Sequence, residues 1–549
     1  MPAPSSLRSL PGAPVALAGP LVVSAPAALG RESRWLRRVL EAGTGWRVDV
    51  VAPSTPADVV LETDPSLRRA AGAAVEGAYR LVVADGVVRV TGDGGAGVFY
   101  GLQTLRQLLP DETLRRAPVL AAAQGSSAGR VRRRTGALRI EPVAVVDAPQ
   151  FAWRGVHLDV SRHFMPKSFL FDLVDLAAFH KLNVLHLHLT DDQGWRVEIE
   201  RYPRLVEVGA WRRRSPLGHA RERRFDREPH GGYYTKDDLR EVVAFAAERH
   251  VVVVPEIDMP GHVVAAIAAY PELGHSGRPI EVGTRWGVYR HVLNLEPSTI
   301  RFFHDVVHEV CEIFPGPYFH IGGDECPTVE WRRSERARAI MAAEGFDDPR
   351  RLQGWFSAQI APAIASHGKR LVGWDEILEA GAPEDAVVMS WRGLEGGVTA
   401  ASRGHDVVMV PEEWLYFDWS YADDPAEPLA IRGPTPVEKV YGFDPVPAGI
   451  PDDRRDRVLG AQCQLWTEYV KTPERAEYQY FPRLCAFAEA VWSQPTLTGA
   501  RSYPMFEPRL SRHLRRLAAL GVNYRPLEGP TPGQSRTWRR PPARGAPPR

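Results

Sequence analysis

The sequence predicts an α/β protein in which a small α/β domain of the α+β sandwich type precedes a (β/α)8 barrel. Eight short apolar runs between residues 155 and 466 have the length of buried strands, and most are continuous, as in parallel sheets covered on both faces. Amphipathic stretches with helical spacing separate many of these runs. Eight such units over about 340 residues fit a barrel that long loops enlarge beyond the usual length of roughly 250 residues.

Size and composition are those of an ordinary globular protein. The chain has 549 residues, of which 44% are hydrophobic and 25% charged, so two or more domains are expected. The net charge of +1 does not indicate nucleic acid or an anionic membrane as a partner. No window approaches the roughly 20 uninterrupted apolar residues that span a bilayer. Prolines interrupt the N-terminal segment, which lacks the charged and then apolar pattern of a secretory signal peptide. A cytoplasmic location is therefore the default expectation, and secretion stays open.

The cysteines form neither a disulfide framework nor a metal-binding motif. Cys311, Cys326, Cys463 and Cys485 are widely separated, and no CxxC pair occurs. We expect them to be reduced and to act as small buried hydrophobic residues.

Residues 1–148 are expected to form the N-terminal domain, with a flexible N-terminus. Asp85-Gly86 lies between two apolar runs, which is a strong β-hairpin signal. The segment Gly97–Leu109 has helical spacing and stops before Pro110. The low-complexity run 121–136 is predicted to be a flexible surface loop.

Residues 149–526 are expected to form the barrel domain. The strand candidates, in chain order, are Gly155–Val160, Val184–Thr190, Val251–Asp258, Tyr318–Gly323, Arg370–Trp374, Ala386–Trp391, Val407–Pro411 and Val458–Trp466. The clearest helices are Lys167–Lys181, Lys236–Arg249, Thr299–Phe314 and Arg350–His367.

Three segments depart from the repeating pattern of the barrel. The link Trp419–Arg457 is rich in Pro and Asp and shows no convincing helix. Phe506–Leu520 is predicted to be a closing helix, and residues 527–549 a disordered Pro/Arg-rich tail.

Polar and aromatic residues gather where the predicted strands end, which is the side of a (β/α)8 barrel that carries the active site. Four carboxylate clusters and three tryptophans lie there, although acids are rarely buried without partners. Tryptophan faces stack on the apolar faces of sugar rings, while carboxylates and arginine bind hydroxyls. The mixture indicates a carbohydrate site.

The stretch from Tyr318 to Glu325 is the most informative of these strand ends. Two glycines follow a short apolar strand and precede Asp324 and Glu325. Because side chains in a regular strand alternate between faces, adjacent acids would point apart, whereas Gly-Gly allows the chain to turn. The pair can then serve one ligand in two different ways.

These residues resemble glycoside hydrolase family 20, the β-N-acetylhexosaminidases. The matching motifs are HIGGDE at His320–Glu325, HLHLTDDQGWR at His186–Arg196, PEIDMPGH at Pro255–His262, GWDE at Gly373–Glu376, LWTE at Leu465–Glu468 and GVNYRP at Gly521–Pro526. They cover the chain from about Trp153 to Pro526 in the family's order, and the upstream module resembles the small domain that precedes the barrel in this family.

The resemblance implies a role for each matching residue. Glu325 is expected to be the general acid/base, and Asp324 to hold the substrate's 2-acetamido group, whose carbonyl oxygen attacks the anomeric carbon. Asp191 and His262 are expected to support Glu325. Seven further residues are expected to bind the sugar and its acetamido group: Arg162, Trp374, Trp391, Tyr416, Asp418, Trp466 and Glu468.

The implied activity is exo-acting, retaining hydrolysis of terminal β-linked N-acetylglucosamine or N-acetylgalactosamine through an oxazolinium intermediate, without metal or other cofactor. The implied partner is a glycan or glycoconjugate. Most retaining glycosidases place two carboxyls about 5–5.5 Å apart across the bond, and family 20 is a substrate-assisted exception. This chemistry needs Glu325 protonated while Asp324 stays ionised, a split of pKa values between neighbouring carboxyls.

Two other interpretations of the sequence stay open. The pair His186 and His188 on one strand would suit a metal-dependent hydrolase on the same fold, because neutral imidazoles are zinc ligands. Other strand ends carry further candidate ligands, namely His157, His262, His320 and several aspartates. A catalytically inactive sugar-binding module would keep the tryptophans and Arg162 but should have lost an acid, and both Asp324 and Glu325 are present.

Overall fold

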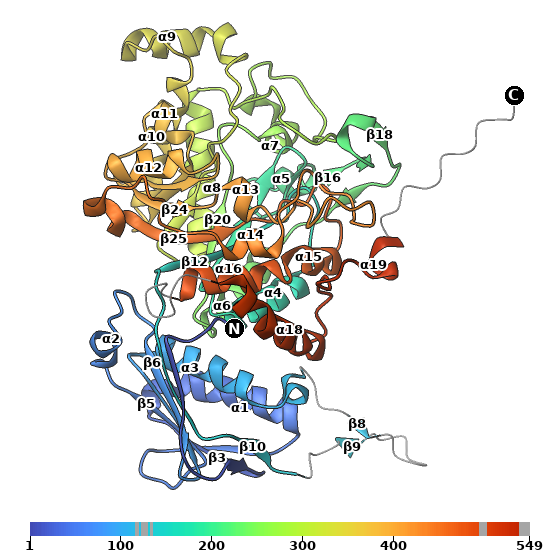
Figure 1. Ribbon diagram of the computed structural model, residues 1–549. Coiled ribbons are helices and arrows are strands. Elements are labelled where there is room, and N and C mark those ends of the chain that lie inside the picture. Colours follow the sequence, from blue (N-terminus) through green and yellow to red (C-terminus); the bar gives the residue numbers. More distant parts are fainter. Residues whose placement is uncertain (116–119, 122–129, 132–135, 494–501, 537–549) are drawn as a thin grey trace, which may run out of the picture.

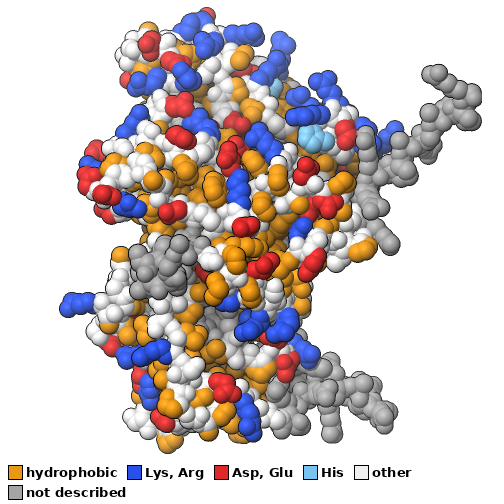
Figure 2. Space-filling view, in the orientation of Figure 1, with side chains coloured by type: hydrophobic (Ala, Val, Ile, Leu, Met, Phe, Trp, Pro, Cys, Tyr) orange, Lys and Arg blue, Asp and Glu red, His pale blue; other side chains and the backbone are white. Residues whose placement is uncertain are grey.

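The computed structural model of the chain describes residues 1–115, 120–121, 130–131, 136–493 and 502–536. A sheet domain at the N-terminal end lies against one end of a larger barrel domain (Figure 1). Acidic and basic side chains are interspersed on the face that Figure 2 shows, in keeping with the net charge of +1. Among the described residues no helix combines the length and apolar character needed to cross a membrane.

The N-terminal domain is built on a seven-stranded mixed sheet with the order β1-β11-β6-β7-β5-β3-β4. Its strands are β1 (Ser6–Ser9), β11 (Val143–Asp147), β6 (Tyr79–Ala84), β7 (Val87–Gly92), β5 (Val59–Thr63), β3 (Leu21–Ser24) and β4 (Val48–Val51). Helices α1 (Gly30–Thr44) and α3 (Gly95–Leu108) lie between this sheet and the barrel (Figure 1).

The predicted hairpin and helix of this domain are present, and part of the N-terminus that was predicted to be flexible forms a strand. Asp85 and Gly86 have φ values of 51° and 78° and join β6 to β7, as a turn with two left-handed residues requires. Strand β1 instead pairs antiparallel with β11, so Ser6 lies opposite Val146. The predicted loop 121–136 falls largely outside the described residues.

Eight parallel strands close the predicted (β/α)8 barrel. They are β12 (Trp153–Asp159), β13 (Val184–His188), β20 (Val252–Glu256), β21 (Tyr318–His320), β22 (Arg370–Trp374), β23 (Val387–Ser390), β24 (Asp406–Met409) and β25 (Val458–Cys463). The main surrounding helices are α4 (Lys167–Phe179), α6 (Lys236–Ala247), α8 (Pro297–Ile313), α10 (Arg351–Ala365), α12 (Glu395–Ser402) and α16 (Arg483–Trp492).

Several elements end elsewhere than the sequence predicts. Strand β21 stops at His320, because Gly322 and Gly323 adopt left-handed φ values of 67° and 86°. The link after Trp419 contains a short α-helix, α14 (Val437–Tyr441), and a short 3-10 helix (Asp452–Arg457). The closing helix α18 runs from Tyr503 to Ala519.

The tail is ordered further than the sequence predicts. Residues 527–536 are described and include the short helix α19 (Pro532–Arg536). The Gln534 side-chain amide fastens this segment by donating to Asn523 Oδ1 at 3.1 Å and to the Tyr524 carbonyl at 3.0 Å. All four cysteines are free thiols, and three are buried while Cys326 is half-buried.

A buried polar cluster joins the two domains. Lys181 Nζ lies 2.8 Å from Asp147 Oδ2, and both side chains are fully buried. The Tyr79 hydroxyl and the Trp492 indole N–H also donate to Asp147 Oδ2, at 2.8 Å and 3.0 Å. A buried ion pair is tolerated only when its remaining hydrogen-bonding capacity is met, as here.

Candidate active site

A cavity of about 280 Å3 opens at the carboxyl ends of the barrel strands. Nine of the eleven sequence-predicted site residues line it, namely Arg162, Asp324, Glu325, Trp374, Trp391, Tyr416, Asp418, Trp466 and Glu468. The other two, Asp191 and His262, are buried and contact these residues from behind. The structure therefore brings the whole predicted set together.

The chain after β21 makes an unusual left-handed turn that presents two consecutive acids. Glu325, like the two glycines before Asp324, has a positive φ, here 42°. A Cβ on Gly322 would lie only 1.9 Å from Asp258 Oδ1, so no larger residue fits there. Asp324 and Glu325 consequently both line the cavity, with 15% and 43% of their side chains exposed.

His262 is the common neighbour of the two acids. Its Nε2 lies 3.7 Å from Asp324 Oδ2 and 3.5 Å from Glu325 Oε2, while its Nδ1 lies 3.3 Å from Asp191 Oδ1. Burial alone would lower the pKa of His262, but the charges of Asp191 and Asp324 outweigh burial and raise it well above its usual range. A cationic imidazole thus stands behind both carboxyls.

The two acids differ in pKa in the opposite sense to the expectation. Burial, together with the charge of Glu325, raises the pKa of Asp324 to about 6. The contact with His262 lowers the pKa of Glu325 below its usual range, despite partial burial. Of the two carboxyls, Asp324 is therefore the one that holds a proton more readily.

Arg162 is held rigidly beside this pair. Its guanidinium lies 2.6 Å from Asp191 Oδ2, donates to Gln193 Oε1 at 3.1 Å and sits over the Trp466 ring, 5.0 Å from its centroid. The charge of Asp191 is the largest influence that offsets burial and keeps the pKa of Arg162 well above its usual range. The arginine is thus a preoriented cation for hydroxyl groups.

Four aromatic residues surround one part of the cavity. The Trp374 indole N–H donates to Glu256 at 2.9 Å, and the Trp391 N–H donates to Glu376 at 3.0 Å. Tyr416 stacks on Trp391 with ring centroids 6.2 Å apart and an interplanar angle of 16°. Trp466 lies 5.9 Å from Trp374 and 6.2 Å from Tyr416. A buried acceptor, Glu256, and a half-buried one, Glu376, fix the two N–H groups and with them the ring orientations.

Two acceptor atoms in the cavity lack partners. Asp324 Oδ1 and Asp418 Oδ1 are buried and receive no hydrogen bond from any residue that the structure describes. Because an unsatisfied buried acceptor is costly, both are suited to receive donors from a ligand.

Comparison with known proteins assigns this arrangement to a family. Residues 151–495 match the catalytic domain of glycosyl hydrolase family 20, and residues 1–143 match domain 2 of the same family. The chain belongs to glycosyl hydrolase family 20.

Two curated relatives of this family 20 chain are named beta-hexosaminidases. One from Porphyromonas gingivalis is 42% identical over 439 residues, covering 80% of this chain and 53% of that protein. Another, from Vibrio furnissii, is 34% identical over 497 residues, covering 89% and 75%. The chain thus spans about half the length of the first relative and three quarters of the second.

Solved family 20 structures match over both domains. An exo beta-N-acetylglucosaminidase from Vibrio harveyi, in complex with N-acetylglucosamine, superposes with a TM-score of 0.80 at 31% identity, covering 96% of this chain and 78% of that one. A beta-N-acetylhexosaminidase from Streptomyces coelicolor gives a TM-score of 0.79 at 30% identity, covering 95% and 96%.

The histidine pair of the family 20 barrel lies beneath the cavity. His186 and His188 approach Glu256 Oε2 at 3.2 Å and 2.6 Å, and His320 approaches Glu256 Oε1 at 3.0 Å. Trp374, which covers Glu256, lines the cavity, whereas the three histidines do not. An ion held by Glu256 and these three histidines would therefore be separated from a bound substrate by Trp374.

Five residues at the cavity were not predicted to bind substrate: Arg392, Glu412, Trp419, Ile431 and Arg432. Four of them lie in or beside the long connection after β24, where no motif marks them. Arg432 lies 3.3 Å from Glu412 and over the Trp419 ring, so these residues form one rim of the opening. The length of a βα connection was the only signal that this segment would reach the site.

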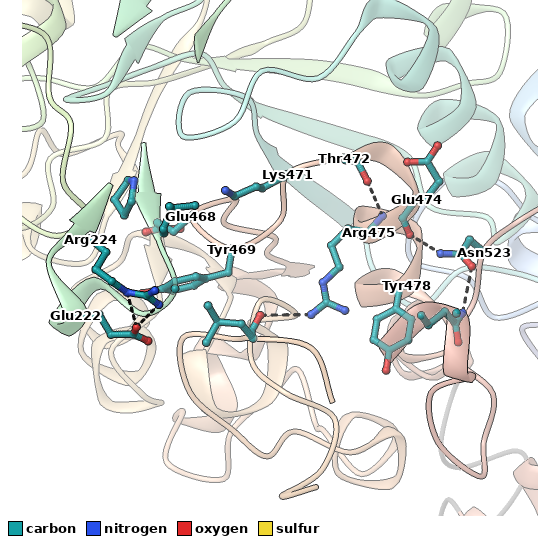
Figure 3. A pocket seen from close by; sticks show the side chains of 16 residues that line it. Glu222, Arg224, Glu468, Tyr469, Lys471, Thr472, Glu474, Arg475, Tyr478 and Asn523 are labelled. Carbon is teal, nitrogen blue, oxygen red and sulfur yellow. Dashed lines mark hydrogen bonds and ion pairs between the residues drawn. The ribbon is translucent and has the colours of Figure 1, made fainter. Parts of the chain in front are cut away.

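A second cavity of about 880 Å3 adjoins the site, since Glu468 lines both. Its walls are the hairpin of β17 (Pro216–Leu217) and β18 (Arg224–Phe225), the N-terminal part of α15 (Pro473–Tyr480) and residues of α19. Figure 3 shows Tyr469, Lys471, Arg475 and Tyr478 around it. The loop 202–234, which carries no motif of its own, thus contributes to the surroundings of Glu468.

Proposed function

We propose that the chain is an exo-acting, retaining β-N-acetylhexosaminidase that uses its substrate's acetamido group as the nucleophile. The observation that carries this proposal is the placement of Asp324 and Glu325 on one side of a small cavity, both beside His262. Carboxyls that flank a glycosidic bond from opposite sides suit a classical nucleophile and acid. Two consecutive carboxyls on one side instead suit separate roles, in which one carboxyl holds the nucleophile and the other protonates the leaving group.

Substrate binding would move the shared proton to the residue that needs it. The acetamido N–H donates to the unsatisfied Asp324 Oδ1, and this hydrogen bond stabilises the ionised form of Asp324. The sugar also covers Glu325, whose partial exposure is then lost, and burial raises the pKa of its carboxyl. The proton therefore passes to Glu325, where it can be transferred to the glycosidic oxygen.

The chemical steps follow from these positions. The acetamido carbonyl oxygen attacks the anomeric carbon as Glu325 protonates the departing oxygen, which gives an oxazolinium ion and the free aglycone. Glu325, now ionised, removes a proton from water as the water attacks the same carbon and reopens the ring. Two inversions at the anomeric carbon give net retention. Holding the acetamido group against this carbon lowers the activation free energy by several kcal/mol through proximity.

The remaining cavity residues suit the rest of a terminal N-acetylhexosamine. Trp374, Trp391, Tyr416 and Trp466 would enclose the acetamido methyl group, and the Tyr416 hydroxyl would donate to its carbonyl. Arg162, Asp418 and Glu468 would bind ring hydroxyls. The volume of about 280 Å3 is below the range of about 300–1,000 Å3 typical of drug-sized ligands, which supports binding of a single terminal sugar.

Hydrolysis of two aryl β-glycosides side by side tests the proposed function. We expect release of the phenol from the N-acetylglucosaminide and no detectable release from the glucoside, because glucose lacks the acetamido nucleophile. Chito-oligosaccharides should lose single residues from one end. Equal cleavage of both aryl glycosides, or internal cleavage of the oligosaccharides, would overturn the proposal.

A further inference from the structure

Three buried side chains outside the active site direct soft donor atoms at one point. His180 follows α4, Cys485 lies in α16 and His513 lies in the closing helix α18. The two imidazole Nε2 atoms are 2.9 Å apart, and Cys485 Sγ is 3.5 Å from His180 Nε2. All three ligand atoms lie within 4.8 Å of one another, and all three residues are buried.

Hydrogen bonding alone does not satisfy this cluster. His180 Nδ1 lies 2.7 Å from the Leu176 carbonyl oxygen, which can only accept, so Nδ1 carries the proton and Nε2 has a single free lone pair. His513 Nε2–H and Cys485 S–H would compete for that lone pair. His513 Nδ1 also has no hydrogen-bond partner among the residues that the structure describes.

The same geometry suits a metal ion. Zinc bonds of about 2.0–2.1 Å to nitrogen and 2.3 Å to sulfur place tetrahedral ligand atoms about 3.3 Å (N to N) and 3.6 Å (N to S) apart. The observed separations of 2.9 Å and 3.5 Å need only a small adjustment. A backbone carbonyl on the second ring nitrogen, as at His180, is the usual way in which a histidine ligand is oriented.

We propose that His180, Cys485 and His513 bind one thiophilic transition-metal ion, Zn²⁺ or Cu⁺, and that this ion fastens the closing helix to the barrel. Imidazole and thiolate donors select these two ions over hard cations. The ion would link the end of α4 to α16 and α18, which lie about 300 residues further along the chain. Because the site is buried, the ion would enter as the chain folds. This role is structural and independent of the proposed hydrolysis.

Refolding of the full chain tests the site. The protein is unfolded in guanidinium with a chelator, freed of both, and refolded with ZnCl2, with a Cu⁺ complex or with neither. After desalting, mass spectrometric metal analysis should find about one ion per chain with Zn²⁺ or Cu⁺, and the two arms identify the preferred ion. Less than a tenth of an ion per wild-type chain in both arms would overturn the proposal without recourse to any variant.

Cobalt provides a signal that requires the sulfur–metal bond itself. Wild-type protein refolded with CoCl2 should show a thiolate-to-cobalt charge-transfer band, and Cys485→Ala should lose it. The matched control is Cys463→Ala, which removes another buried thiol whose sulfur donates to the Gly155 carbonyl at 3.8 Å, and which should keep the band. Circular dichroism verifies that both variants fold. A band that persists in Cys485→Ala, or that disappears equally in both variants, would contradict the assignment.

Discussion

At the scale of single residues, the chemistry depends on which of two adjacent carboxyls holds a shared proton. Asp324 is enclosed and its pKa is raised to about 6, while Glu325 is closer to solvent and to the His262 cation. Acid catalysis by Glu325 needs the reverse order of pKa values, with the pKa of Glu325 above that of Asp324. On our account the substrate establishes it, through one hydrogen bond to Asp324 and through covering Glu325.

The pH dependence of kcat/KM reports this pair in the free enzyme. The reactive form carries one proton on the pair, and that proton is lost as pH rises through the raised pKa of Asp324, about 6. We expect kcat/KM for an aryl N-acetylglucosaminide to fall above this pH. The corresponding fall in kcat should occur at a higher pH. In Asp324→Asn the residual activity should fall at a lower pH, because the pKa of Glu325 is below its usual range. An unchanged alkaline limb in Asp324→Asn would contradict the shared proton.

Replacement of the acid should depend on the leaving group. Glu325→Gln should lower kcat/KM by about 10²–10⁴ for substrates with basic leaving groups, the range of general acid catalysis, and by less for activated aryl glycosides. Glu413→Gln, an exposed carboxyl on α13 (Glu412–Leu415), is the control and should retain the wild-type rate. A uniform loss across leaving groups would indicate that Glu325 positions the substrate and does not protonate it.

At the scale of elements, the end of β21 determines the site. His320 is the last residue of the strand, and the left-handed residues that follow turn the next two acids into one cavity. The Gly-Gly pair allows a turn at this place to be predicted from the sequence. The left-handed conformation of Glu325, a non-glycine residue with a φ of 42°, could not be predicted, because contacts with its surroundings hold it in this conformation.

Gly322→Ala isolates the role of this turn. Gly345, which ends α9 (Glu335–Glu344), has nearly the same φ, 68° against 67°, but no atom within 4 Å of an added Cβ. Both alanine variants should lose roughly 1–2 kcal/mol of stability from the left-handed backbone. Only Gly322→Ala should also displace Asp258 and reduce kcat/KM strongly. Denaturant unfolding and kinetics on both variants decide this, and equal activity in the two would show that the turn is not critical.

At the scale of the whole molecule, the N-terminal domain is tied to the barrel by the buried cluster around Asp147. Asp147→Ala would leave Lys181 buried without its counter-ion and should cost about 3–5 kcal/mol. Glu241→Ala removes an exposed partner of Lys167 and should cost about 0–1 kcal/mol. Unfolding followed by both fluorescence and circular dichroism measures the difference. Similar small losses in the two variants would mean that the interface does not depend on this pair.

Much of this architecture can be predicted from the sequence, because each barrel strand is a local apolar run and each acid cluster follows one. Features set by distant partners could not be predicted. Strand β1 is short, polar and exposed, and only its pairing with β11 defines it. Ile431 and Arg432 reach the cavity from a long connection without a motif. The order of the pKa values of Asp324 and Glu325 depends on how deeply each side chain is buried, which the local sequence does not reveal.

In the proposed mechanism the acetamido carbonyl of the substrate is the nucleophile. Measurement of kcat/KM for aryl N-acylglucosaminides with acetyl, fluoroacetyl and trifluoroacetyl groups tests this role, since fluorine withdraws electrons from that oxygen while changing the size of the group little. We predict a steep, progressive fall in rate with each added fluorine in the wild-type enzyme. Equal rates across the series would show that the carbonyl does not attack, and would assign the nucleophile to the protein.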